Sequence, residues 1–178
     1  MKIKCIIATL IASASGVCAQ DVAPIQLSLT PDIALQSRTT TIHGLSLNIW
    51  GENPQKSLTL GIVNGSTGDS GGLSWGLVNY ADSYTGVAWG FVNVSQTSFV
   101  GWQHGWFNIS RGTFSGFQSG WILNFAGEFH GLQLGLVNYA GNLHGVQLGF
   151  ANIASNNPWF DEFPDKLAKG FLILNWSF

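Results

Sequence analysis

A repeat of about 15 residues covers more than half of this chain. Between Ser57 and Asn152 the pattern G-x-x-x-G-x-x-N occurs seven times, at a spacing of 14 to 16 residues. Ser57 replaces the first glycine of the earliest unit, and one extra residue precedes Asn124. The second glycine and the asparagine of each unit are Gly61, Gly76, Gly90, Gly105, Gly120, Gly135 and Gly149, and Asn64, Asn79, Asn93, Asn108, Asn124, Asn138 and Asn152. A fixed period of this kind predicts a fold built from stacked copies of one unit.

Within each unit, large apolar residues alternate with small or polar ones. In one unit Leu132, Leu134 and Leu136 alternate with Gln133 and Gly135. This period of two is typical of a β-strand, and the recurrent glycines and aromatic residues argue against a helix. Trp and Phe occupy the large positions of other units, where such side chains are usually buried. The sequence therefore predicts strands that turn their large apolar face, including the tryptophans, toward the core.

Two β architectures can be built from such a unit. In a parallel solenoid each unit is one coil, and equivalent residues stack about 4.8 Å apart, so that the repeated asparagines form a ladder of side-chain amides. In an antiparallel barrel each unit is one strand, and successive asparagines lie at opposite rims. The uniform connections and the apolar residues found all round the unit favour the solenoid. We expect an all-β, parallel β-solenoid of about seven 14–16-residue coils with non-repeat β caps.

The alternative is an antiparallel outer-membrane β-barrel of about ten strands. The segment from Leu172 to Phe178 alternates in polarity and ends in Phe, which resembles the assembly signal of such barrels. Two strands before the repeat, the seven units and this last segment give about ten strands, an even number as in bacterial barrels. The direction in which successive units run decides between the two architectures.

The two ends of the chain differ from the repeat. A basic tip, an apolar stretch and a small-residue cleavage site that ends at Ala19 predict a secretory signal peptide. Because Cys5 and Cys18 both lie within it, the exported chain would have no disulfide, cysteine nucleophile or zinc–thiolate site. The predicted organisation is a signal peptide over 1–19, an N-terminal β cap over 20–56, the repeat region over 57–155, and a loop with a C-terminal strand cap over 156–178.

Charged residues are scarce, at 9% of the chain. Without residues 1–19 the chain has five Lys or Arg against nine Asp or Glu, a net charge of about −4 with neutral His. The lack of a basic face argues against nucleic acid as a partner, and the lack of a long apolar run after the signal argues against a transmembrane helix. The charges of the repeat region all lie in the connections between strands, which we expect to form a solvated edge: Asp69, Asp82, Arg111 and Glu128.

Few residues suggest chemistry. His130 and His144 occupy equivalent places in adjacent units, with Glu128 nearby. Two histidines are an incomplete set of metal ligands, so we interpret them as solvated edge residues rather than as a metal or proton site. His104 lies among the large apolar positions and is expected to be a hydrogen-bonded core residue. No pattern indicates a catalytic, cofactor-binding or metal site, and we expect the protein not to be an enzyme.

The units Gly131-Leu-Gln-Leu-Gly-Leu-Val-Asn138 and Gly145-Val-Gln-Leu-Gly-Phe-Ala-Asn152 resemble those of the bacterial surface repeat-containing proteins, a largely uncharacterised family. The resemblance covers about residues 22–178 and implies secretion with surface or outer-membrane association. We therefore expect an exported repeat protein of the bacterial cell surface, outer membrane or periplasm, acting as a structural or interaction module with an envelope, protein or glycan partner. The alternative is a small outer-membrane barrel that acts as a pore or anchor.

Overall fold

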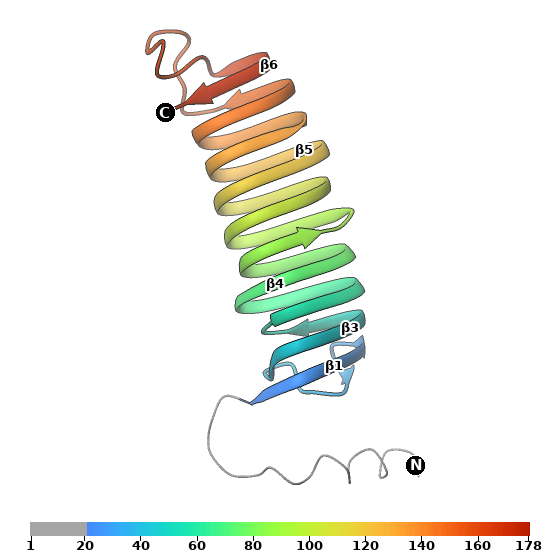
Figure 1. Ribbon diagram of the computed structural model, residues 1–178. Helices are drawn as coiled ribbons and strands as arrows, with labels where there is room; N and C mark the ends of the chain where they lie inside the picture. Colours follow the sequence, from blue (N-terminus) through green and yellow to red (C-terminus); the bar gives the residue numbers. More distant parts are fainter. Residues whose placement is uncertain (1–20) are drawn as a thin grey trace, which may run out of the picture.

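The computed structural model describes residues 21–178, which form a long, narrow stack of β-coils (Figure 1). In chain order the strands are β1 (Val22–Thr30), β2 (Ile33–Ala34), β3 (Thr41–Asn53), β4 (Lys56–Trp89), β5 (Val92–Ala154) and β6 (Gly170–Ser177). Strands β4 and β5 are long because each winds through several coils. The predicted signal peptide and both cysteines lie outside the described residues. Among residues 21–178 no helix is long and apolar enough to cross a membrane.

Successive coils run parallel. Strand β1 pairs in parallel with β3, β3 with β4, and β4 with β5. At the far end of the stack β6 pairs antiparallel with the last part of β5 and covers it, with the loop before β6 folded over the same end (Figure 1). The predicted parallel β-solenoid is confirmed, and the alternative of an antiparallel barrel is wrong. Because β1 and β3 belong to the parallel stack, coil stacking begins before the repeat pattern does.

A ladder of asparagine side chains runs through the interior. The amide of Asn48 donates to Oδ1 of Asn64 at 3.1 Å, and each later asparagine of the repeat donates to the next one at 2.8–3.0 Å as far as Asn152. All of these side chains are buried. The ladder stays unbroken at Asn124 despite the extra residue before it. Each amide satisfies its neighbours, so the column is buried without the cost of unpaired polar groups.

Asn48 belongs to the ladder although it precedes the repeat pattern. In the register of β3 and β4 the backbone of Asn48 lies beside Gly61, whereas Gly51 lies beside Asn64. The Asn48 side chain occupies the space that a side chain at Gly51 would need, and from there it reaches Asn64. At the other end of the ladder Asn152 donates to two backbone carbonyls, one of them in β6. The glycine at position 51 therefore extends the ladder by one coil.

Two further columns fill the interior. Gln147, Gln133 and Gln118 each donate to the preceding glutamine, ending at Gln103, over 2.7–2.9 Å. Beside them the buried rings of one aromatic residue per coil stack with centroids 5.3–5.6 Å apart, at Tyr84, Phe99, Phe114 and Phe129. The interior is thus built from stacked planar groups, amides as well as rings.

The structure reverses the predicted assignment of the two strand faces. The small and polar residues point inward, and the large apolar residues of the alternating set point outward: Trp75 is 61% exposed and Trp121 is 69% exposed. A coil of 14–16 residues encloses a narrow interior that accepts small residues, stacked amides and one ring per coil. The amides tolerate burial because they pair along the stack. The expectation that the tryptophans form the core is therefore wrong.

The first glycine, which is present in six of the seven units, is required by backbone conformation. Gly72, Gly86, Gly101, Gly116, Gly131 and Gly145 have φ between 117° and 142°, which L side chains rarely adopt. A Cβ at Gly116 would also collide with the Gly101 carbonyl oxygen in the coil below. At these positions the backbone of the coil below leaves no room for a side chain.

The glycine requirement can be measured with a matched pair of substitutions. Gly116→Ala should lower the free energy of unfolding by ~3 kcal/mol or more, because it adds a collision to backbone strain. Gly68→Ala should cost only ~1–2 kcal/mol, because the φ of Gly68 is 59° and no atom lies within 4 Å of the added carbon. Equal losses in denaturant titration would contradict the close approach of coils at Gly116.

The ladder predicts an unusual pH dependence for Asn93→Asp. A carboxylate at position 93 can accept from Asn79 but cannot donate to Asn108. Because burial raises the pKa of this carboxyl in the folded chain, the variant should approach the parent stability below about pH 4 and lose it as pH rises toward 7. Unfolding measured across this range checks the prediction. The exposed change Asn142→Asp is the control, and an equal pH dependence in both variants would contradict burial of the ladder.

Candidate interaction surface

Two rows of outward-pointing side chains run along one edge of the solenoid, on either side of the second glycine of each unit. Nine of the twelve are exposed large apolar residues, and we call the two rows together the apolar edge. The first row is Trp75, Trp89, His104, Ser119, Leu134 and Leu148, and the second row is Leu77, Phe91, Trp106, Trp121, Leu136 and Phe150. Exposed apolar surface of this extent is typical of an interaction site.

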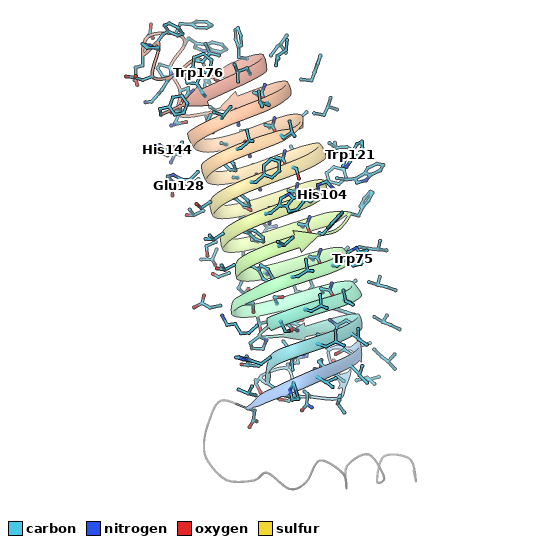
Figure 2. The ribbon with its side chains drawn as sticks, in the orientation of Figure 1. Trp75, His104, Trp121, Glu128, His144 and Trp176 are labelled. Carbon is cyan, nitrogen blue, oxygen red and sulfur yellow. The ribbon has the colours of Figure 1, made fainter. Side chains whose placement is uncertain are left out.

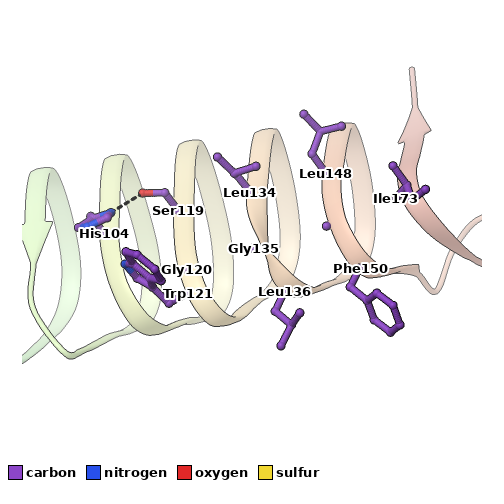
Figure 3. Close-up of a pocket in the computed structure, with 11 residues that line it drawn as sticks. His104, Ser119, Gly120, Trp121, Leu134, Gly135, Leu136, Leu148, Phe150 and Ile173 are labelled. Carbon is purple, nitrogen blue, oxygen red and sulfur yellow. Dashed lines mark hydrogen bonds between the residues drawn. The ribbon is translucent and has the colours of Figure 1, made fainter.

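The apolar edge is hollowed between its two rows. One hollow of about 580 Å³ lies between Leu134 and Leu136 and between Leu148 and Phe150 (Figure 3). A second, of about 400 Å³, continues along the same edge past the four tryptophans of the two rows. The second glycines of the units line both hollows. The second glycines therefore have two roles. They line the hollows on the outside of the coil, and they leave room for the asparagine ladder on the inside.

Aromatic contacts hold the side chains of the apolar edge side by side. The rings of Trp75 and Trp89 lie 6.3 Å apart, and those of Phe91 and Trp106 lie 4.8 Å apart. His104 packs edge-on against Trp89 at 5.3 Å. Contacts between neighbouring coils reduce the freedom that each ring would lose on binding. The surface is therefore largely preorganised.

A hydrogen-bonded group of polar side chains interrupts the first row. Trp102 Nε1 donates to Ser119 Oγ at 2.9 Å, and Ser119 Oγ lies 2.8 Å from His104 Nδ1 (Figure 3 shows the second contact). Because the indole can only donate, the hydroxyl proton of Ser119 is free to point at His104. Among residues 21–178 no carboxylate hydrogen-bonds the other ring nitrogen of His104, so the pair lacks the orienting acid of a catalytic triad.

His104 was expected in the core, and the structure places it on the outer face. It is half-buried against Trp89 of the preceding coil and Trp102 of its own coil, and it is hydrogen-bonded as predicted. The group of Trp102, His104 and Ser119 was not predicted, because its members come from two different coils. Only the coil register brings them together.

Glu128 and His144 lie on the opposite side of the stack from Trp75 and Trp121 (Figure 2). The rings of His130 and His144 stack at 4.7 Å, and Nε2 of His130 lies 3.2 Å from Glu128. These groups are substantially exposed, in agreement with the interpretation as solvated edge residues. In the part of the chain that the structure describes, no group of three or more His, Cys, Asp and Glu could hold a metal ion.

Two tyrosines have perturbed hydroxyl groups. Burial raises the pKa of Tyr84, whose ring is the first in the interior column of stacked rings. Burial also raises the pKa of Tyr80, whose hydroxyl accepts from Trp50 Nε1 at 3.1 Å and donates to Glu52 at 3.0 Å. Tyr80 lies over Gly65, where a Cβ would collide with its ring. Tyr80 thus bridges to the coil beyond Gly65, whereas Tyr84 contacts the next coil through its ring, which stacks on Phe99.

The chain matches no protein-family model, no curated protein and no solved structure. The resemblance of its units to the surface repeat-containing proteins therefore stays an interpretation of the sequence.

The reversal of the two faces predicts opposite effects for two aromatic substitutions. Phe114→Ala should lower the free energy of unfolding by ~3–5 kcal/mol, because Phe114 is fully buried between two other rings. Trp121→Ala should change it by less than ~1 kcal/mol, because most of that side chain is already in contact with solvent. Denaturant unfolding of both variants checks this, and a larger loss for Trp121→Ala would contradict the outward orientation.

Proposed function

We propose that this protein is an exported, non-enzymatic module of the bacterial cell envelope that acts through its repetitive outer surface. The observation that supports this most directly is the apolar edge, which exposes large apolar side chains along successive coils. An isolated soluble domain gains nothing from such a surface, whereas a protein that binds a partner does. The solenoid is the rigid frame, since its columns of hydrogen-bonded amides fix the spacing of every outward residue.

Features of the described residues favour a binding module over an enzyme. The interior is filled by amide and ring columns, and the hollows of the apolar edge are lined mainly by hydrocarbon. The one Ser–His contact on that edge has no orienting carboxylate among residues 21–178. The role of pore that we considered from the sequence required a barrel, and the parallel coils form a solenoid instead.

The basic tip and apolar stretch at the start of the chain support the export part of the proposal. Expression in a bacterium should yield an envelope-fraction protein whose mature N-terminus is Gln20, measured by fractionation and intact mass. The change Leu10→Arg should leave unprocessed protein in the cytoplasm, because a charge interrupts the apolar stretch. Leu10→Ile is the matched control. An uncleaved parent protein in the cytoplasm would contradict export.

A further inference from the structure

Charge is segregated across the solenoid. Within residues 57–155 the four charged side chains, Asp69, Asp82, Arg111 and Glu128, are exposed in the connections between strands. The opposite edge has none, and its exposed residues there are Trp, Phe and Leu. Figure 2 shows Trp75 and Trp121 on one side and Glu128 on the other. In cross-section the coil is therefore amphipathic, with a polar edge and an apolar edge.

The apolar surface continues round the apolar edge onto both faces of the coil. In one coil the edge residues Leu134 and Leu136 are flanked along the chain by Leu132 on one side and by Val137 and Tyr139 on the other, and all five are at least partly exposed. A flat protein surface, including a second copy of this chain, could cover one face and would leave the other in water. Fluid hydrocarbon surrounds a protruding edge from both sides.

The charge of the surface also identifies the kind of partner. Recognition of anionic headgroups requires clustered Lys or Arg, and the apolar edge contains neither. An uncharged surface matches the uncharged acyl region of a lipid layer, where apolar area drives binding. Tryptophan, which has an apolar ring and one N–H donor, is enriched where hydrocarbon meets the headgroups. The exposed residues of the apolar edge include four tryptophans: Trp75, Trp89, Trp106 and Trp121.

We propose that the apolar edge is a membrane-docking surface that inserts into the acyl region of a lipid layer, with the solenoid axis parallel to the plane of the membrane. This rests on the proposed function, because it names lipid as the partner of the outer surface. The two rows run along the solenoid axis. All coils from Trp75 to Phe150 would therefore insert their edge side chains to about the same depth. The charged connections remain in water on the opposite side.

The test uses the exported protein, purified from the expressing bacterium, and vesicles of phosphatidylcholine. The protein should float with the vesicles, and about 1 M salt should not release it, because the attraction is not electrostatic. Lipids brominated near the headgroup should quench its tryptophan fluorescence. The double change Trp121→Glu with Leu136→Glu should weaken binding about tenfold or more, with an unchanged β circular-dichroism spectrum. The control Thr97→Glu with Asn142→Glu adds the same charge at exposed positions away from the apolar edge and should bind like the parent.

Several outcomes would overturn the proposal. Each of three results would contradict lipid docking: the parent protein does not float with the vesicles, brominated lipids do not quench its fluorescence, or the two double variants lose binding equally. Quenching uses unmodified protein, so the test stands even where the edge variant fails to fold. Failure to bind lipid, together with a dimer that Trp121→Glu dissociates, would show that a second copy occupies the edge. A correctly exported protein that ignores lipid would leave the envelope function intact and remove only the lipid partner.

Discussion

The hydrogen bond from one asparagine amide to the next sets the geometry of the whole solenoid. It recurs from Asn48 to Asn152, always in the interior and always at 2.8–3.1 Å. From Asn64 onward each amide pairs with the equivalent amide of the next coil, which requires coils that stack in parallel and in register. The ladder therefore fixes the direction, spacing and alignment of the coils together, and a slip of one residue in any coil would leave buried amides unpaired.

Filling the interior with amides has a direct consequence for the outside of the molecule. Each coil has room for one asparagine, one residue of the glutamine column and one ring, as with Asn124, Gln118 and Phe129. The remaining large apolar side chains have no interior place, so the same alternation that makes the strands puts Trp and Phe in the solvent. The apolar edge and its charge-free composition thus follow from the narrowness of the coil, and the proposed role at a lipid surface builds on that geometry.

The sequence predicted the features that repeat at a fixed period. The parallel solenoid followed from asparagines at one place in every unit, and the stacking of His130 on His144 followed from their equivalent positions. The orientation of the strand faces could not be predicted in the same way, because ordinary burial statistics place Trp inside and Gln outside. Periodicity shows that the two faces of a strand differ. Only the width of the coil interior decides which of these faces points inward. Asn48 escaped detection because it lies at the register position of a glycine.

The ladder is tested most directly by hydrogen exchange of the asparagine side-chain amides, followed by NMR on ¹⁵N-labelled protein. If the amides form a buried, hydrogen-bonded column, those of the central members such as Asn93, Asn108 and Asn124 should exchange far more slowly than the exposed amide of Asn142. Exchange of the central amides at the rate of Asn142 would show that they are open to water, and would contradict the architecture described above.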